Sequence, residues 1–370
     1  MLRSKEKKAS KFSVEVLRSK GKKQTVFRLK HCVASEPLAL NCAKTAANNA
    51  QPSISRIEER ARNSGEYPAR KHTAAVRTLC VILENSQTMR IAIFADIHGK
   101  ILLPFKLVDL YQKETGNKVD FILQCGDIGA FPNLENLDKA TIRHAQNDRD
   151  ELGFYDDFTK INQGIRIFLD ELNINMICVR GNHEDHDFLD NLENENAQNT
   201  LFPIDIYKRV FVCKSGLKQE LKTEEETLTF VGIGRIGDRN GKTEKQFIQE
   251  YEKKQIRKLL KTKDNFDILV THDKDDSSQR GYGMAEIREL LDNINFHYHF
   301  YGHTGEPFNQ KIGLNGITQS VKIKELEFNE SGIVGKGCMI VLVKEKEKLN
   351  IEIVDQKLTN KLNKYNWKWQ

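Results

Sequence analysis

The sequence of 370 residues predicts an α/β domain in which β-sheets lie buried between layers of helices. Short apolar runs rich in Ile, Val, Leu and Phe recur from residue 90 onward, and the earlier runs alternate with helix-like stretches. The later runs follow one another closely, as strands of a sheet edge do. An apolar share of 39% and a charged share of 30% suit a soluble globular protein of this class.

Each apolar run has the length of a strand and is bounded by Gly, Asp or Asn. We expect strands at RIAIFA (90–95), VDFILQC (119–125), INMICV (174–179), RVFVC (209–213), LTFVGI (228–233), FDILVT (266–271), HYHFY (297–301), CMIVLV (338–343) and LNIEIV (349–354). We expect helices over 101–114, 163–172, 243–262 and 284–293. The sequence contains no internal repeat.

The chain divides into a basic N-terminal extension, residues 1–88, and a domain over residues 89–356. The extension is polar and weakly periodic, which fits a disordered basic arm, an organelle-targeting peptide, or a start codon assigned too far upstream. We expect a disordered or spurious extension, because MRIAIFAD at Met89 resembles a natural beginning. The polar segment 130–162 is expected to be an insertion forming a small helical cap, and residues 357–370 a basic aromatic tail packed on the surface.

Charge and cysteine usage exclude several classes of protein. Residues 1–88 hold 18 Lys and Arg against 7 Asp and Glu, whereas residues 89–370 hold 40 against 45. The mildly acidic domain disfavours a long polyanionic partner, and no apolar run approaches the roughly 20 residues of a membrane helix. The seven cysteines are scattered without a CxxC pair, which favours a reducing, cytoplasmic location, with organelle import expected only if the extension is real.

Five of the expected strands are followed at once by a carboxylate, an imidazole or an amide. These groups are Asp96 and His98 after the first strand, Asp127 after the second, Asn182 and His183 after the third, His272 after FDILVT, and His303 after HYHFY. Sites in open α/β sheets form in the crevice beyond the carboxyl ends of the strands. The sequence therefore predicts one site built from five strand ends.

The types of these side chains indicate the chemistry. Carboxylate, imidazole and amide ligands without a thiolate suit a pair of Mn, Fe, Zn, Ni or Mg ions rather than a structural zinc. Two such ions about 3.5–4 Å apart can bind both the attacking oxygen and the phosphoryl oxygens of an in-line displacement. Because its two oxygens can serve different ions, a carboxylate is the best bridge, and Asp127 is the expected one.

The motifs DIH (96–98), GD (126–127), GNHE (181–184), a strand-terminal His (272) and GH (302–303) stand in this order along the chain. Over residues 89–355 this arrangement resembles the calcineurin-like metallophosphoesterase family. The resemblance implies a four-layer sandwich of two mostly buried β-sheets flanked by helices. It also implies that Asp96 and His98 hold the first ion, Asp127 bridges, Asn182, His272 and His303 hold the second ion, and His183 protonates the leaving group without being a ligand.

The chain departs from the family pattern at Gly305, where many members carry a second histidine for the first ion. We therefore expect the first ion to be held weakly. The protein phosphatases of this superfamily lack that histidine as well, so activity is still expected. Protein phosphatase activity itself is not expected, since GDIGAFP and THD replace the GDxxDRG and HGG motifs of that subgroup.

Some neighbouring residues have a plainer interpretation than a role in the site. His297 and His299 alternate along their strand, so we expect packed or hydrogen-bonded sheet residues rather than ligands. Arg235, Arg239 and Arg280 lie in glycine-bearing loops and are candidates for clamping a phosphate, with solvated surface arginine as the commoner alternative.

The expected function is hydrolysis of a phosphomonoester or phosphodiester by a metal-activated hydroxide, with Mn as the favoured ion and His183 as general acid. The expected substrate is a phosphorylated small molecule or nucleotide. Two alternatives remain open: a non-catalytic scaffold that keeps this fold for protein contacts, and a metal-dependent nuclease using the basic extension to bind nucleic acid.

Overall fold

The computed structural model describes residues 88–238, 241–262, 264–275 and 281–368, together with the backbone of residues 16–18 and 25–27. The chain forms two compact units, Met1–Arg77 and Thr78–Gln370. In the first unit, β1 (Val16–Arg18) pairs antiparallel with β2 (Thr25–Phe27). The expectation of a disordered or spurious extension otherwise falls outside the described residues.

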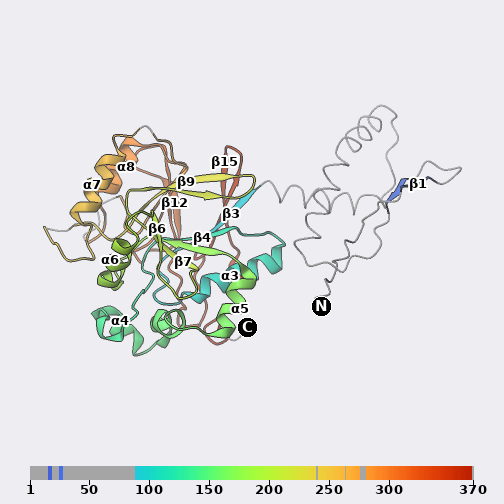
Figure 1. Cartoon of the computed structure of the whole chain (residues 1–370), viewed down its shortest axis with the longest axis horizontal. Helices are drawn as coiled ribbons and strands as arrows, with labels where there is room; N and C mark the ends of the chain where they lie inside the picture. The colour runs from blue at the N-terminus through green and yellow to red at the C-terminus, as the bar shows by residue number, and fades with distance from the viewer. Residues whose placement is uncertain are drawn as a thin grey trace, which may run out of the picture. The chain divides into compact units, whose positions relative to one another are not determined.

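The second unit contains two mixed β-sheets (Figure 1). In spatial order, the seven-stranded sheet consists of β15 (Lys348–Ile353), β14 (Ile340–Glu345), β3 (Met89–Phe94), β4 (Phe121–Gln124), β5 (Asn175–Cys178), β7 (Val210–Cys213) and β6 (Leu201–Pro203). The six-stranded sheet consists of β12 (Asn309–Ile312), β13 (Gln319–Lys322), β11 (Tyr298–Tyr301), β10 (Ile268–Thr271), β9 (Thr227–Ile233) and β8 (Lys218–Lys222). Strands β3, β4, β5 and β7 run parallel, as do β9, β10, β11 and β13.

Helices connect the parallel strands. The longer ones are α3 (Leu102–Thr115), α5 (Gln163–Leu172), α6 (His186–Glu195), α7 (Glu250–Leu259) and α8 (Ala285–Asn293), and α9 (Gln356–Thr359) is short. The segment 130–162 folds as η1 (Leu134–Asn136), α4 (Lys139–Ala145), η2 (Arg149–Leu152) and the π-turn η3 (Phe154–Phe158). The helix expected over 243–262 begins only at Glu250, because Gln249 and Glu252 form a capping box that fixes its start.

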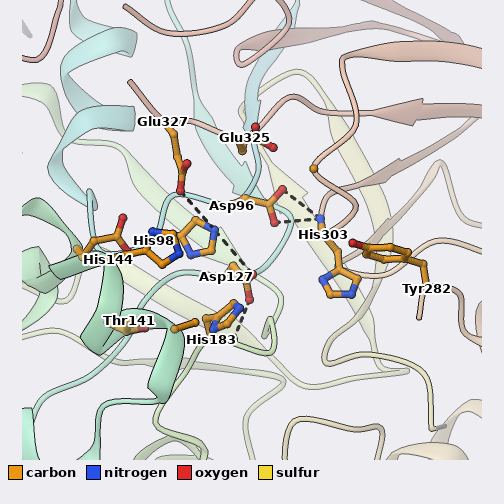
Figure 2. Close-up of a pocket in the computed structure, with 13 residues that line it drawn as sticks. Asp96, His98, Asp127, Thr141, His144, His183, Tyr282, His303, Glu325 and Glu327 are labelled. Carbon is orange, nitrogen blue, oxygen red and sulfur yellow. Dashed lines mark hydrogen bonds and ion pairs between the residues drawn. The ribbon is translucent and has the colours of Figure 1, made fainter. Parts of the chain in front are cut away.

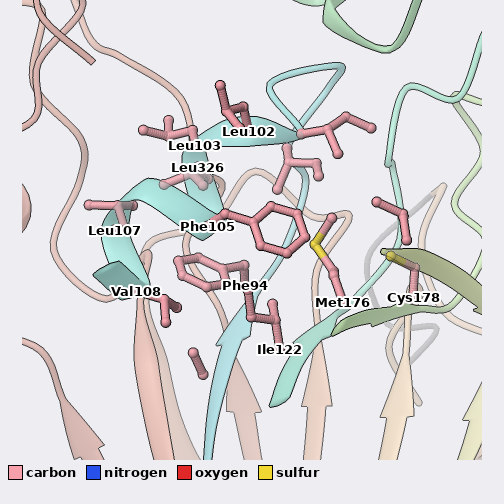
Figure 3. Close-up of a cluster of buried hydrophobic side chains, with 14 of the residues drawn as sticks. Phe94, Leu102, Leu103, Phe105, Leu107, Val108, Ile122, Met176, Cys178 and Leu326 are labelled. Carbon is pink, nitrogen blue, oxygen red and sulfur yellow. The ribbon is translucent and has the colours of Figure 1, made fainter. Parts of the chain in front are cut away.

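Strand β3 shows how the layers are built, because its residues alternate between two cores. Ile91 and Ile93 belong to the core between the sheets, together with Ile268 of β10. Phe94 faces the other way and packs with Phe105 of α3, as Figure 3 shows. A third core lies under α7 and α8 on the outer face of the six-stranded sheet. The expected sandwich of two sheets flanked by helices is therefore confirmed.

The C-terminal residues pack onto this domain. The indole of Trp367 is buried in the core that contains α3, and its Nε1 donates a hydrogen bond to Asp150 Oδ2 at 3.0 Å. Its ring also lies 6.3 Å from that of Phe328. Trp367 is thus more deeply packed than a residue of a surface tail, because it fills a space beside the helical segment 149–158, whereas Tyr365 is 80% exposed.

Two arginines are buried at the ends of β5 and β9. Arg235 has no exposed side chain, and its guanidinium lies 2.9 Å from Asp190 of α6 and 2.9 Å from Glu252 of α7. Arg180 pairs with Asp190 as well, and its carbonyl accepts a 2.8 Å hydrogen bond from the Arg235 amide. Arg235 is therefore neither a phosphate clamp nor a surface arginine, since it links two helices and both sheets. Arg239 and Arg280 lie outside the described residues.

Removing this buried guanidinium should destabilise the fold strongly. We expect Arg235→Ala to lower the free energy of unfolding by about 3–5 kcal/mol, because Glu252 would keep a buried charge without its partner. Arg257→Ala, at a half-exposed position on α7, should lower it by less than about 1 kcal/mol. Urea denaturation of both variants measures the difference, and equal losses would contradict the interpretation.

Candidate metal centre

The five strand ends meet around one cavity of about 390 Å³. Asp96 and Asp127 come from β3 and β4 of one sheet, and His303 comes from β11 of the other (Figure 2). The described residues that line the cavity are Asp96, His98, Asp127, Ala140, Thr141, His144, Glu151, His183, Tyr282, His303, Gly305, Glu325 and Glu327. His272, which is buried, and Asn182 lie directly behind Asp127, in contact with its carboxylate or with each other.

Sharp turns place these side chains just beyond the strands. Asp96, His98, Asp127 and His303 all have positive φ angles, between 39° and 66°, which non-glycine residues seldom adopt. Such strain concentrates where the surrounding structure holds a functional geometry. Gly181 is needed for close approach, because a Cβ there would lie 2.0 Å from Asp127 Oδ1.

The Asp127 carboxylate lies at the centre of the cluster. Its Oδ1 accepts hydrogen bonds from the backbone amides of Asn182 at 2.7 Å and His183 at 2.8 Å. His272 Nε2 lies 3.2 Å from the same oxygen. Burial alone would raise the pKa of Asp127, but the neighbouring imidazoles, with His272 foremost, hold it well below its usual value.

Two groups of side chains could each hold a metal ion. Asp96, His98 and Asp127 form one group, and Asp127, His272 and His303 the other, with the ligand atoms of each group within 4.8 Å of one another. Ligands about 2.0–2.2 Å from a shared ion lie up to about 4.4 Å apart. The separations from Asp127 to His272 (3.2 Å) and to His98 (3.9 Å) meet this limit. The oxygen and nitrogen donors present therefore fit the pair of divalent ions expected from the sequence.

Asn182 and His303 both lie close to His272, as ligands of the same ion would. Asn182 Oδ1 is 3.0 Å from His272 Nε2, and the imidazole rings of His272 and His303 are 4.7 Å apart. His272 Nδ1 donates to the Cys125 carbonyl at 2.9 Å, which leaves Nε2 as the nitrogen able to bind an ion.

His183 stands at the edge of the cavity with its Nδ1 2.7 Å from Asp138 Oδ2. Burial would lower the pKa of His183, but the carboxylates of Asp127 and Asp138 outweigh it and raise the pKa to about 9. The imidazole is therefore protonated near neutral pH. Asp138 belongs to the segment 130–162, and no sequence signal singled it out.

Glu184 holds the loops of the site together. Its two carboxylate oxygens accept hydrogen bonds from the amides of Ile128, Gly181 and Ala130 at 2.8–3.0 Å. Burial, with the nearby charge of Asp127, raises the pKa of Glu184 to about 7 despite these bonds. The next residue, Asp185, caps α6 by accepting a hydrogen bond from the Phe188 amide at 3.1 Å.

Besides the strand-end side chains, three segments contribute to the cavity walls: 130–162, the loop that carries Tyr282, and the segment with Glu325 and Glu327. Thr141 and His144 of α4 form one wall, and Tyr282 faces His303 with ring centroids 5.0 Å apart. The carboxylate of Asp273 fixes the Tyr282 loop by accepting from the Gly283 amide at 2.9 Å. No Lys or Arg lines the cavity among the described residues, so its walls are acidic and imidazole-rich.

The other strand histidines take no part in the site. His299 is fully buried in β11, and its Nε2 lies 2.8 Å from Thr271 Oγ1. Burial lowers the pKa of His299 to about 3, so the ring is neutral. His297 precedes the strand and is exposed. Neither histidine is a ligand, as expected, although only His299 is a residue of the sheet.

The family is established by a sequence model described as calcineurin-like phosphoesterase, which matches residues 89–307. The chain belongs to this family. Among curated protein sequences, none matches the chain. Within the described residues, no helix combines the length and apolar character needed to cross a bilayer.

Several solved structures resemble this family member at low sequence identity. TT1561 of Thermus thermophilus is 14% identical, with a TM-score of 0.41 over 72% of this chain and 100% of that one. GAP50, the anchor in the inner membrane complex of Plasmodium, is 14% identical, with a TM-score of 0.42 over 76% and 92%. A phosphatase of Mycoplasma pneumoniae is 11% identical, with a TM-score of 0.38 over 76% and 99%.

The contact between His183 and Asp138 should govern the proton on the imidazole. Because the folded-state pKa is raised, this pair stabilises the fold below pH 6.5, and the contribution is lost as pH rises through about 9. We expect Asp138→Asn to lower the pKa of His183, as measured by an NMR titration of the metal-free protein. Asp170→Asn, at an exposed position on α5, should leave the pKa of His183 unchanged. A pKa of His183 that is the same in Asp138→Asn as in the parent would contradict the role of Asp138.

Proposed function

We propose that this family member is a metal-dependent hydrolase of phosphoric esters that acts through two divalent ions. The observation that carries the proposal is the convergence of side chains from β3, β4, β5, β10 and β11 on one cavity with two overlapping groups of metal-competent donors. A degraded scaffold would have no reason to retain four strained ligand positions.

Each ligand has a role in this proposal. Asp96 and His98 belong to the first ion, Asp127 bridges, and the set Asn182, His272 and His303 belongs to the second ion. Bound divalent ions supply an activated water and neutralise charge on the phosphoryl oxygens. Carboxylate, imidazole and amide donors favour Mn among the candidate ions, with Fe, Zn, Ni and Mg as alternatives.

His183 is the proposed general acid. Its Nδ1 is engaged by Asp138, so Nε2 is the nitrogen that can donate a proton to the leaving oxygen. The Asp138 contact fixes the orientation of the ring, and in the metal-free protein the raised pKa keeps the ring protonated at neutral pH.

The cavity favours a small substrate, either a phosphomonoester or a phosphodiester of a small molecule or nucleotide. Its volume of about 390 Å³ is of the size that holds such a ligand. The carboxylates of Glu151, Glu325 and Glu327 in its walls would repel a long polyanion. This disfavours the nuclease alternative. Binding of nucleic acid that weakens steeply with rising salt concentration would support that alternative again.

A cytoplasmic location accompanies this proposal. The four cysteines among the described residues (Cys125, Cys178, Cys213 and Cys338) are free and buried, as in proteins of a reducing compartment.

Asp127→Asn tests the function directly. We expect the variant to lose bound metal and at least about 100-fold in turnover, because it removes the bridge between the ions. Metal analysis and hydrolysis of p-nitrophenyl phosphate and its bis-ester under Mn, Ni, Zn and Mg provide the measurements. Asp292→Asn, at an exposed position on α8, should behave as the parent.

Two outcomes would contradict the proposal. Unchanged turnover in Asp127→Asn would remove the metal centre from the mechanism. A parent protein carrying well under one ion per chain, and hydrolysing neither ester, would favour the scaffold alternative.

A further inference from the structure

The cavity has open space at Gly305, the position where the family pattern often has a second histidine for the first ion. Gly305 lines the cavity with a φ of +66°, and a Cβ built there would meet no atom within 4 Å. The group therefore consists of Asp96, His98 and the shared Asp127 alone. Three protein ligands, one of them shared, leave the first ion short of charge and of donors.

A buried lysine beside Asp96 further weakens the negative charge that this group offers to the first ion. Lys322 at the end of β13 has no exposed surface, and its Nζ lies 3.7 Å from Asp96 Oδ2. The ammonium donates to the Ile323 carbonyl at 2.6 Å, which fixes its place. Because a positive charge in a buried setting offsets a neighbouring carboxylate strongly, Asp96 attracts a cation less than an unpaired aspartate would.

The chain after β13 brings a further carboxylate to this place. The Leu326 amide donates to the carbonyls of Ala95 and Asp96 at 3.1 and 3.2 Å, and its side chain is buried in the core beside α3. This anchor fixes the segment against the loop that carries Asp96. Its neighbours Glu325 and Glu327 both line the cavity (Figure 2).

Glu327 is directed at the first group. Its Oε1 lies 3.7 Å from His98 Nε2, and Asp127 Oδ2 lies 3.9 Å from the same nitrogen. The Glu327–His98 separation falls within the roughly 4.4 Å limit for two ligands of one ion. Glu327 is not a member of the group whose ligand atoms lie within 4.8 Å of one another, so its carboxylate would have to turn toward the ion. The Glu327 side chain is 42% exposed, so it can change rotamer without displacing packed atoms.

We propose that Glu327 is a ligand of the first ion and supplies the donor that Gly305, which has no side chain, cannot. This inference rests on the proposed metal-dependent function. The added carboxylate offsets the charge of Lys322. It also makes the ligands of the first ion richer in oxygen than those of the second ion. Hard ions such as Mn²⁺ and Mg²⁺ are the class that this shell would favour.

Glu325 provides a matched control two residues away. It lines the same cavity, but its carboxylate forms an ion pair with Lys324. Glu325→Gln and Glu327→Gln therefore remove the same charge from the same wall, and they differ in whether the carboxylate faces His98.

The experiment is a titration of the full metal-free chain with Mn²⁺, in which binding is measured by calorimetry and by electron paramagnetic resonance. We expect two ions per parent chain, and at least a roughly tenfold rise in the dissociation constant of the weaker ion in Glu327→Gln. In Glu327→Gln, the paramagnetic resonance signal of magnetically coupled Mn²⁺ should be replaced by that of isolated Mn²⁺. Glu325→Gln should change the weaker dissociation constant less than about threefold.

Several results would overturn the inference. One is a Glu327→Gln variant that binds both ions as the parent does. Another is a Glu325→Gln variant that weakens binding equally, which would indicate general charge rather than ligation. A parent chain that binds one ion, still lost in Asp127→Asn, would overturn the role of Glu327 and the second ion of the proposed function, but it would leave metal-dependent hydrolysis standing. A parent chain that binds no ion would overturn both.

Discussion

The organisation of this site depends on one buried carboxylate, that of Asp127. A carboxylate in a closed interior is costly unless hydrogen bonds and positive charge surround it. The amides of Asn182 and His183 supply the hydrogen bonds, and the neighbouring imidazoles hold the pKa of the carboxyl well below its usual value. Any side chain at position 181 would collide with that carboxylate, so Gly181 is the residue that fits there. The GNHE turn is thus shaped around Asp127.

The same cluster joins the two sheets. His272, at the end of β10 in one sheet, donates to the carbonyl of Cys125 at the end of β4 in the other. The Asp96 carboxylate accepts from the amide of His303, so β3 and β11 are linked in the same way. Because the ligands come from both sheets, the packing of one sheet on the other sets the geometry of the site. A change in the core between the sheets would therefore alter distances between the ligands.

The sequence predicted those features that depend on local pattern. Strand-length apolar runs identified the strands, and the polar residue after each run identified the side chains that come together at and behind the cavity, since parallel strands end at one edge. Contacts between distant segments left no such pattern. Asp138 meets His183 across 45 residues, and Arg235 meets Asp190 across 45. A glycine-bearing loop gave no indication that Arg235 turns inward between two helices.

The balance of charge in the cavity connects the metal centre with substrate choice. Carboxylates outnumber fixed cations there, and the buried ammonium of Lys322 lies beside Asp96 without lining the cavity. Such a cavity attracts divalent cations and repels a phosphoester until the cations are present. Binding of substrate should therefore follow binding of metal. Under the proposed function, the carboxylates of the walls would make phosphate binding conditional on metal, which a cavity lined with lysine or arginine would not do.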